Sequence, residues 1–422
     1  MLPPPPPNIA ALLARPVAVF GAGVSGRGVL ELLAKIGGVG QVYDEHGAAS
    51  ENAFTPEHAS RHGLVVFSPG FVPHHPWLET ARAADCLCLG ELDFASLFWR
   101  GQLLAVTGTN GKTTLTEFLT HALILAGRPA HQAGNVGYSL SRFVVEQIGR
   151  AEIAVCEVSS FQAETLEHLR PTATLWTNFA EDHLERHPGM DAYFAAKARL
   201  VERTDPGAVF AGSSVQAHAA RSGRALPTSA GVDTLDQPAD PRLAGTVFAG
   251  YPQRENFLLA AAWWKRAGFP EETLYAAAGS FQLGEHRLGK VRERQGVTFW
   301  NDSKATNFHA VEAALSTFAA AVLWIGGGKA KGGDLAGFVR RIAPRIRHAF
   351  LIGETAPVLA GFCRDLRVPA TACASLEAAV RLAVAQATAG DHVLLSPGFA
   401  SFDMFRGYDD RGRQFVNLVE KL

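Results

Sequence analysis

The sequence contains little of the cysteine chemistry that stabilises secreted proteins and small metal-binding domains. Only five of its 422 residues are cysteines, and this odd, scattered set matches neither a disulfide framework nor the ligand spacing of a zinc site. Cys86 and Cys88 are separated by one residue, but their segment is apolar, which favours packing over ligation. The few thiols indicate a reducing compartment, so we expect a cytoplasmic protein.

Neither sign of charge predominates, and no long hydrophobic run is present. The 39 basic and 40 acidic side chains leave a net charge of −1, which argues against nucleic acid as a partner. No apolar stretch reaches the roughly 18 residues of a membrane-spanning helix, so no membrane partner is expected. Residues 3–7 are all proline and indicate a stiff, disordered leader rather than a signal peptide. We expect a monomer whose partners are small molecules.

The most informative stretch is an apolar run followed by a glycine-rich turn and a helical pattern. Residues 103–106 predict a buried strand, and a helix is predicted from Leu115 onward. The turn between them, Gly108-Thr-Asn-Gly-Lys-Thr-Thr114, has glycines that admit an anion and free N–H groups that suit phosphate oxygens. Lys112 would contact the outer phosphates, and the Thr113 hydroxyl would bind Mg²⁺. This turn predicts an ATP or GTP site, although Val106 stands where the strict P-loop has its first glycine.

A second nucleotide-binding pattern lies near the start of the chain. The apolar run 17–20 precedes Gly21-Ala-Gly-Val-Ser-Gly26 and a helical pattern, and a second strand ends at Asp44. In such βαβ units the glycines admit a pyrophosphate and the acidic residue contacts a ribose or base edge. A nucleotide or nucleotide sugar is therefore predicted here. The alternative is a tight strand–helix turn that needs small residues for packing alone.

Polar residues follow two further predicted strands in the middle of the chain. Glu157 ends the apolar run 153–156, and His183 follows the strand 172–176. Because the carboxyl ends of parallel strands meet at one edge of a sheet, both should converge on the loop at Lys112 and supply ligands for Mg²⁺. Lys197 lies on a predicted helix, where the simplest interpretation is a lysine that reaches out to solvent.

The last third of the chain again alternates strands and helices, which predicts a mostly parallel sheet. Its polar loops include residues 301–307, 326–334 and 396–403. Lys304 and Lys331 could hold a carboxylate-bearing substrate or could be solvated loop charges. We therefore expect an α/β protein with domains at residues 1–93, 94–283 and 284–422.

Taken together, these motifs resemble the Mur ligases. The resemblance rests on Gly108-Thr-Asn-Gly-Lys-Thr, on Glu157 with Ser159-Ser-Phe-Gln162, on residues 177–187 with Lys197, and on Asn301-Asp-Ser-Lys-Ala-Thr-Asn307. The match is closest to the members that add D-glutamate to UDP-N-acetylmuramoyl-L-alanine, and it covers nearly the whole chain in order.

The resemblance implies three α/β domains: an N-terminal Rossmann-like domain for the UDP-sugar, a central P-loop-type ATP-binding domain and a C-terminal Rossmann-like domain for the amino acid. It implies an ATP-dependent amide ligase of peptidoglycan precursor synthesis that forms an acyl phosphate. Its cofactors would be ATP, two Mg²⁺ ions and CO₂ held as a carbamate on Lys197.

The resemblance also assigns residues to each part of the reaction. It places catalysis on Lys112, Glu157, His183 and Lys197. It places ATP on Gly108, Thr109, Asn110, Gly111, Lys112, Thr113, Thr114, Asn256, Arg287 and Asp302. It places the UDP-sugar on Ser25, Asp44, Glu45, Ser68, Gly70, Asn135 and His183. It places D-glutamate on Lys304, Thr306, Lys331, Ser401 and Tyr408, and the two metal ions on Thr113, Glu157, His183 and carbamylated Lys197.

Some positions depart from the family pattern. Pro252 and Gln253 stand in place of a usual His-Asn, His46 in place of a common basic contact to UDP, and Phe399 and Tyr408 in place of a common Cys and Phe.

A ligase for L-lysine or diaminopimelate would carry an Asp-Asn-Pro-Arg loop, which the sequence lacks. A nucleotide-dependent dehydrogenase, or a catalytically silent relative acting as a partner protein, would leave Lys112, Glu157 and His183 unexplained.

Overall fold

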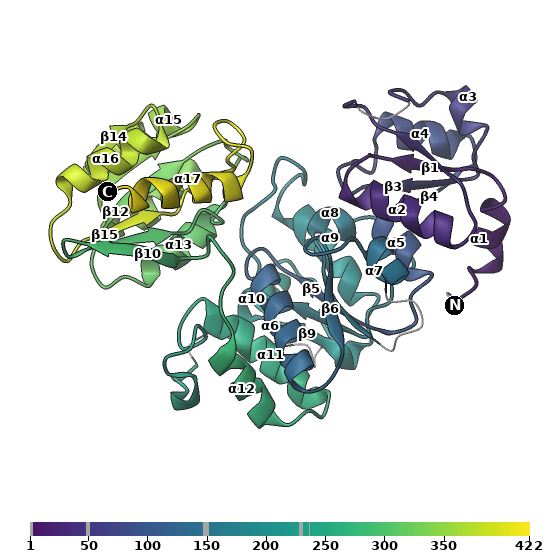
Figure 1. Cartoon of the computed structure of the whole chain (residues 1–422), viewed down its shortest axis with the longest axis horizontal. Helices are drawn as coiled ribbons and strands as arrows, with labels where there is room; N and C mark the ends of the chain where they lie inside the picture. The colour runs from purple at the N-terminus through teal and green to yellow at the C-terminus, as the bar shows by residue number, and fades with distance from the viewer. Residues whose placement is uncertain (1–2, 48–50, 147–151, 228–230, 236) are drawn as a thin grey trace. The chain divides into compact units, whose positions relative to one another are not determined.

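The computed structural model describes residues 3–47, 51–146, 152–227, 231–235 and 237–422 (Figure 1). The chain divides into two compact units. The first comprises Met1–Phe179, Asp191–Ala249 and Gln253–Phe281, and the second comprises Ala180–Met190, Gly250–Pro252 and Gln282–Leu422. The described part of the chain contains two β-sheets in the first unit and one in the second, all of them flanked by helices.

The first sheet is short and parallel, and its two central strands are fully buried. Its strands lie in the order β2-β1-β3-β4. They are β1 (Val17–Phe20), β2 (Gly40–Tyr43), β3 (Leu64–Phe67) and β4 (Leu87–Gly90), with helices α1 (Pro7–Leu12), α2 (Val24–Lys35), α3 (Pro56–Ala59), α4 (Pro76–Ala83) and α5 (Glu91–Ser96). Every residue of β1 is buried, because parallel strands covered by helices on both faces need apolar side chains throughout.

The second sheet is also parallel, and the strand before the predicted phosphate turn lies at its centre. Its order is β6-β7-β5-β8-β9, so β5 pairs with both β7 and β8. The strands are β5 (Gln102–Thr107), β6 (Ala130–Gly134), β7 (Ile153–Glu157), β8 (Ala173–Trp176) and β9 (Val209–Ala211). The helices are α6 (Lys112–Leu125), α7 (Leu140–Glu146), α8 (Ser160–Ala163), α9 (Met190–Val201), α10 (Ser213–Arg221), α11 (Gln253–Arg266) and α12 (Glu271–Ser280), and short 3₁₀ turns lie at Pro206–Ala208 and Pro241–Leu243.

Two buried carboxyl groups on α5 join the first sheet to the second. The Glu91 carboxylate accepts a hydrogen bond from Ser141 N at the start of α7, at 2.7 Å. Asp93 accepts three more, from the backbone N–H groups of residues 167, 168 and 169. One hydrophobic core, which includes Val19 and Ala105, runs through both sheets. These hydrogen bonds and the shared core hold the two sheets of the first unit against each other.

The third sheet, in the second unit, is parallel except at one edge. Its order is β10-β11-β15-β12-β13-β14, with β10 antiparallel to β11. The strands are β10 (Gly289–Arg294), β11 (Val297–Asn301), β12 (Val322–Gly327), β13 (Ile346–Ile352), β14 (Ala370–Ala372) and β15 (His392–Leu395). The helices are α13 (Phe308–Ser316), α14 (Leu335–Ile342), α15 (Ala356–Asp365), α16 (Leu376–Gln386) and α17 (Tyr408–Glu420), with a 3₁₀ turn at Ala343–Arg345.

The prediction of an α/β fold built on parallel sheets is confirmed, whereas two local predictions are wrong. The proline leader is not wholly disordered, because Pro7 occupies the first turn of α1, where a missing N–H costs nothing, and Ile9 is buried in the core. Residues 205–245 are rich in glycine, proline, serine and aspartate, a composition that predicts short strands and loops, yet they include the nine-residue helix α10. The domain boundaries at residues 93 and 283 stay predictions.

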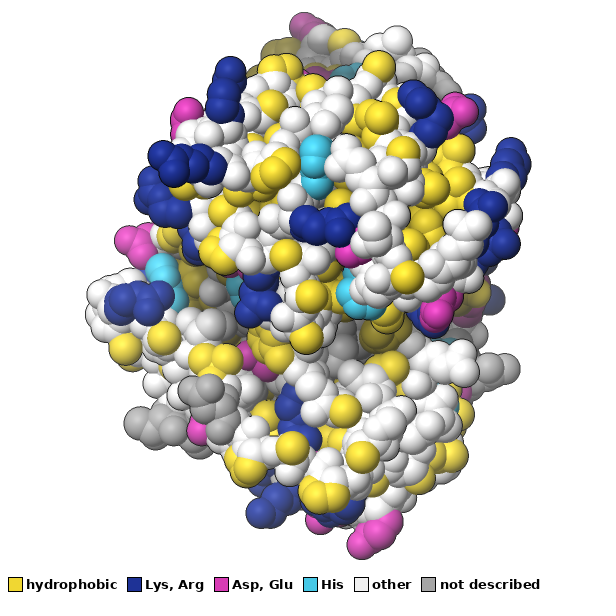
Figure 2. Space-filling model, turned by 90° about the vertical axis from the view of Figure 1, so that its left-hand side faces the viewer, with side chains coloured by type: hydrophobic (Ala, Val, Ile, Leu, Met, Phe, Trp, Pro, Cys, Tyr) yellow, Lys and Arg dark blue, Asp and Glu magenta, His cyan; other side chains and the backbone are white. Residues whose placement is uncertain are grey.

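The described helices include none that is both long and apolar enough to cross a lipid bilayer. On the face drawn in Figure 2, lysine and arginine side chains occur at several separate places among neutral and apolar ones. This scatter agrees with the net charge of −1.

We expect replacement of Asp93 by alanine to weaken the joint between the first two sheets. Three backbone N–H groups would lose their acceptor, which should lower the free energy of unfolding by about 2–3 kcal/mol. Urea unfolding followed by circular dichroism measures this change. The matched control is Glu272→Ala at the exposed start of α12, which should change stability by less than about 0.5 kcal/mol. Equal unfolding midpoints for Asp93→Ala and the control would contradict the assignment.

Candidate active site

The turn after β5 has two positions that only glycine can fill. Gly108 has φ +145°, and a Cβ built there would lie 1.9 Å from Thr177 Oγ1. Gly111 has φ +81°, and a Cβ there would lie 2.6 Å from the side-chain oxygen of Asn256. Left-handed backbone and close approach both exclude larger residues here. The turn is thereby packed between the end of β8 and the start of α11.

Two residues that the sequence analysis did not assign hold this turn in shape. The side chain of Asn178 accepts from Asn110 N at 2.9 Å and donates to Asn110 O at 3.1 Å. Thr177 Oγ1 also donates to Asn110 O, at 2.6 Å. The only signal in the sequence was the Thr-Asn pair directly after a strand.

The first turn of α6 presents the predicted phosphate-binding side chains. Lys112 Nζ donates to Gly108 O and Thr109 O, both at 2.9 Å, so it lies over the turn. Thr113 and Thr114 are buried on the first turn of the helix. The N–H groups and the positive end of the helix dipole therefore face the same place as a lysine, which suits phosphate oxygens. All the predicted ATP residues of the first unit, Asn256 included, lie together.

Glu157 ends β7 beside the phosphate turn, and only one of its two carboxylate oxygens accepts a hydrogen bond within the described residues. It lies opposite Val106 of β5 and is 2% exposed. Its Oε1 accepts from Asn135 Nδ2 at 2.9 Å, whereas its Oε2 is buried with no hydrogen-bond partner in the described part of the chain. A buried, unpartnered carboxylate oxygen is costly unless a cation or water satisfies it. The donor type and position fit Mg²⁺.

Lys197 does not reach out to solvent. On α9 it is 1% exposed, and its Nζ donates to Gly108 O at 2.9 Å and more weakly to Thr107 Oγ1 at 3.4 Å. The lysine therefore lies against the phosphate turn, and its burial excludes a role as an ordinary surface residue.

Most of the predicted UDP-sugar residues line one pocket at the carboxyl edge of the first sheet. The pocket has a volume of about 340 Å³, and its lining includes Ser25, Asp44, Glu45, Ser68 and Gly70. Asn135, assigned to the same ligand, instead contacts Glu157.

Other features of this pocket were not foreseen. His75, absent from the predicted set, also lines it, and its Nε2 lies 3.3 Å from a Glu45 oxygen. The two oxygens of Asp44 accept from Ala22 N and His46 N, and these hydrogen bonds lower the pKa of its carboxyl. Asp44 therefore stabilises the glycine turn as an anion.

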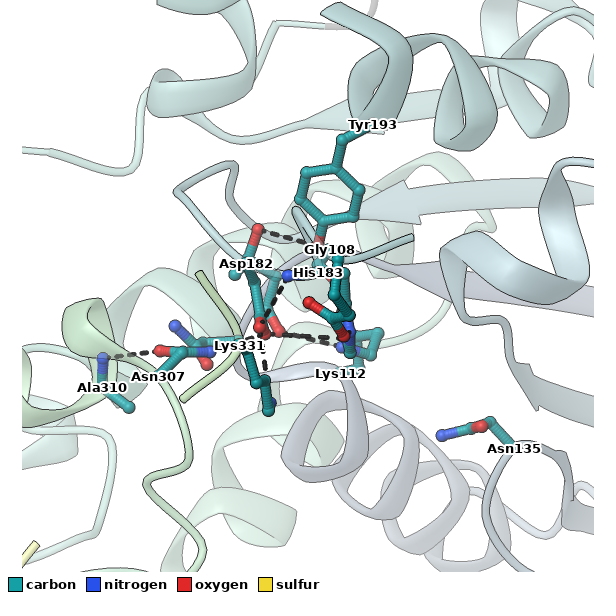
Figure 3. Close-up of polar contacts among 12 residues, drawn as sticks. Gly108, Lys112, Asn135, Asp182, His183, Tyr193, Asn307, Ala310 and Lys331 are labelled. Carbon is teal, nitrogen blue, oxygen red and sulfur yellow. Dashed lines mark hydrogen bonds and ion pairs between the residues drawn. The ribbon is translucent and has the colours of Figure 1, made fainter. Parts of the chain in front are cut away.

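In the second unit, His183 lies in a cluster of charged side chains (Figure 3). Asp182 accepts from Asn307 Nδ2 at 2.9 Å and pairs with Lys331 Nζ at 3.4 Å. His183 Nε2 lies 3.7 Å from the same carboxylate. These residues and Thr306 line one small pocket. Burial lowers the pKa of His183 although the Asp182 carboxylate acts in the opposite direction, and the neutral imidazole is the form that binds a metal.

The other predicted amino-acid residues lie on the loops after β11 and β15 and at the start of α17. Lys304 Nζ donates to Tyr408 Oη at 2.8 Å and lies 4.0 Å from the centre of the same ring. Ser401 is buried in the loop after β15. Arg287 and Asp302, predicted to contact ATP, belong to this second unit. The structure thus divides the predicted ATP residues between its two units.

Comparison with known sequences now identifies the family. Residues 106–224 match the Mur ligase middle domain, and residues 286–399 match the domain described as "Mur ligase, glutamate ligase domain". A UDP-N-acetylmuramoylalanine--D-glutamate ligase from Gloeobacter violaceus is 38% identical over 390 residues, which cover 87% of each chain. The chain belongs to the Mur ligase family. A relative of the same name from Nocardia farcinica is 35% identical and covers 97% of each chain.

Solved structures agree on the fold of this Mur ligase. UDP-N-acetylmuramate-alanine ligase MurC from Thermotoga maritima superposes with a TM-score of 0.61 at 15% identity, over 96% of this chain and 99% of that one. MurF from the same organism, solved with ADP, gives 0.58 at 16% identity, over 96% and 94%. At such identities the likeness concerns the fold.

The residues of this Mur ligase fit a magnesium ion at Glu157 better than at an unmodified Lys197. Within the described residues no group of three or more His, Cys, Asp and Glu side chains could hold a metal ion. A cation at Glu157 would therefore take most of its ligands from the nucleotide and water, as Mg²⁺ commonly does. An ammonium at Lys197 would repel a cation, whereas an anionic form of this side chain would attract one.

We predict a pH-dependent effect on stability from Asp302, which is buried at the end of β11. Its carboxylate accepts from Ser396 Oγ and Leu288 N, but burial raises its pKa to about 7. The unfolded chain releases this proton near pH 4, so the folded state loses stability as the pH rises from there to about 7. Asp302→Asn does not titrate, and its stability relative to the wild type should rise by roughly 2–3 kcal/mol between pH 5 and pH 8.

Urea unfolding of both proteins at the two pH values measures this difference. Asp365→Asn, at the exposed end of α15, is the control and should show a constant difference. A pH-independent difference for Asp302→Asn would contradict the raised pKa.

Proposed function

We propose that this Mur ligase joins D-glutamate to UDP-N-acetylmuramoyl-L-alanine at the expense of ATP, in the synthesis of peptidoglycan precursors. The observation that carries the proposal is the shared name of its relatives, because proteins called UDP-N-acetylmuramoylalanine--D-glutamate ligase are 32–38% identical to it over most of its length. The buried phosphate turn with Glu157 and Lys197 supports the use of ATP.

The chemistry follows from the weakness of a carboxylate as an acyl donor. Transfer of the terminal phosphoryl group of ATP to the alanyl carboxylate makes an acyl phosphate, whose phosphate is a good leaving group. The amine of D-glutamate then attacks the carbonyl carbon, and the tetrahedral adduct expels phosphate. Both steps build negative charge, which Lys112 and the N–H groups of the α6 turn are placed to stabilise. Bound Mg²⁺ would supply further neutralisation of the phosphate oxygens.

The proposed roles follow the assignments drawn from the resemblance. ATP would be held by the Gly108–Thr114 turn and Asn256, with Arg287 and Asp302. Thr113 and Glu157 would bind one Mg²⁺, and His183 and carbamylated Lys197 a second. The 340 Å³ pocket would hold the UDP moiety, with Asn135 and His183 nearer to the sugar peptide. Lys304, Thr306, Lys331, Ser401 and Tyr408 would hold D-glutamate.

We further propose that the chain works as three domains, with boundaries near residues 93 and 283, and as a monomer in the cytoplasm. The three separate sheets support the division. The first and third would be the Rossmann-like domains and the second the P-loop-type domain. A cytoplasmic location agrees with the use of ATP and a UDP-linked substrate.

The decisive experiment measures ADP and phosphate release with ATP, Mg²⁺ and UDP-N-acetylmuramoyl-L-alanine while the amino acid is varied. We expect turnover with D-glutamate and none with L-glutamate or L-lysine. Lys112→Ala should lower the rate by at least about a hundredfold, because it removes a charge that stabilises the transition state. Lys35→Ala, at the exposed end of α2, is the matched control and should be fully active. Turnover with L-lysine in place of D-glutamate would overturn the substrate assignment.

We expect the buried amine of Lys197 to carry a carbamate. After incubation with carbon-13-labelled bicarbonate, the protein should show a carbamate carbon resonance that is absent from Lys197→Gln. Lys35→Gln keeps Lys197 and should keep the resonance. No carbamate signal in the wild type, or the same signal in Lys197→Gln, would rule this out.

A further inference from the structure

A buried arginine that the proposed mechanism does not use lies beneath the amino-acid site. Arg411 is on the first turns of α17 and is 0% exposed. Among the described residues no carboxylate lies within 4.0 Å of its guanidinium, and Asp403 and Asp302 attract its charge only from farther away. Burial of a cation without a direct ion pair costs several kcal/mol, whereas an apolar side chain of similar size would fill the space without that cost. The position therefore calls for a reason other than stability.

The guanidinium of Arg411 donates hydrogen bonds to two different loops. Its Nε donates to Ser303 Oγ at 3.0 Å, and its Nη2 donates to Ser303 O at 2.9 Å. Its Nη1 donates to Phe399 O at 3.3 Å. Burial lowers the pKa of Arg411 to about 10, so the side chain still carries its proton at neutral pH.

The first of these loops carries two of the proposed D-glutamate residues. Ser303 directly precedes Lys304 and lies three residues before Thr306. Its hydroxyl, which accepts from Arg411, donates in turn to Tyr408 O at 2.7 Å. Lys304 then donates to the Tyr408 hydroxyl. Two side chains of the loop after β11, Ser303 and Lys304, therefore hydrogen-bond to Tyr408 at the start of α17.

The second loop carries a third residue of the proposed site. Phe399 is two residues before Ser401, in the loop that follows β15. Since β11 and β15 are neighbours in the sheet, the guanidinium fork spans the loops at the ends of two adjacent strands. One planar guanidinium group thus links both loops to the helix that carries it.

Further contacts near the Arg411 guanidinium also fix the end of β11 against α17. Asn301 accepts from Ser303 N at 3.1 Å and donates to Gly412 O at 3.1 Å. A Cβ at Gly412 would lie 2.4 Å from His286 Nδ1. The glycine therefore lets α17 pack closely against the ring of His286, whose Nδ1 lies 2.9 Å from Asn301 Nδ2.

We propose that Arg411 is the positioning residue of the amino-acid site: it holds the loops of Lys304 and Ser401 and the start of α17 in the arrangement that binds D-glutamate. This inference rests on the proposed function, since it takes that site as given. A lysine at position 411 keeps the positive charge but, having one nitrogen instead of a fork, cannot hold both loops.

The test is the steady-state kinetics of Arg411→Lys with each substrate varied in turn. We expect the KM for D-glutamate to rise by about tenfold or more, because small displacements of binding groups are costly. The KM values for ATP and UDP-N-acetylmuramoyl-L-alanine should stay within about twofold of the wild type. The matched control is Arg413→Lys on the same helix, where Arg413 is exposed and pairs with Asp409. An unchanged KM for D-glutamate in Arg411→Lys, or an equal rise in all three KM values, would overturn the inference.

Two further variants keep the test decisive if Arg411→Lys does not fold. Ser303→Ala removes the hydroxyl that links the guanidinium to Tyr408 and should raise the KM for D-glutamate alone, by about threefold. In Arg411→Ala, millimolar guanidinium should lower the KM for D-glutamate, and in Arg413→Ala it should have no effect. The positioning role is refuted if Ser303→Ala has the wild-type KM for D-glutamate and guanidinium does not lower this KM in Arg411→Ala. A wild-type protein that makes no ADP with D-glutamate refutes the proposed function instead.

Discussion

The first unit depends on one backbone turn, held at a place where three strands end together. The carbonyl oxygen of Gly108 accepts from the amines of Lys112 and Lys197, and the same turn is bonded to Asn178 at the end of β8. Glu157 ends the strand on the other side. Since β5 lies between β7 and β8, the order of the strands alone brings these groups to one edge. Phosphate chemistry is possible there because the lysines and the turn are fixed before any ligand binds.

The second unit meets a similar demand with buried polar groups in place of a glycine turn. Under the proposed function its loops hold an amino acid that carries two carboxylates, and the polar backbone groups of each loop also need hydrogen-bond partners. The chain answers with side chains that bond to backbone, Arg411 to two loops and Asn301 to a third segment. Asp93 in the first unit works in the same way on three N–H groups. In this protein the buried charged side chains Arg411 and Asp93 fix the geometry of loops. Their hydrogen bonds to backbone groups offset part of the free-energy cost of burying them.

The structural features that could be predicted from the sequence are those set by residues close together along the chain. The strand, glycine turn and helix around Lys112 were predictable because each rests on local spacing, and the structure has them in that order. The sequence did not predict contacts between distant segments: Asn178 lies 68 residues from Asn110, and Ser303 lies 108 from Arg411. Lys197 resembled a surface lysine because the spacing of residues along a helix does not show which of its faces the rest of the protein covers. Helix α10 was missed because it is short and lies in a segment rich in glycine, proline, serine and aspartate, which indicates loops.

A substitution that departs from the family pattern shows how these constraints combine in the second unit. A phenylalanine at position 408 would offer Lys304 only the face of its ring, whereas the tyrosine also accepts a hydrogen bond from the amine at 2.8 Å. The lysine is then fixed by two contacts from one side chain, and the backbone of that tyrosine is fixed by Ser303. Such a lysine loses less conformational freedom when it binds a carboxylate, because most of that freedom is already lost. The added hydroxyl therefore acts through preorganisation of Lys304, and Arg411 determines where that preorganised amine lies.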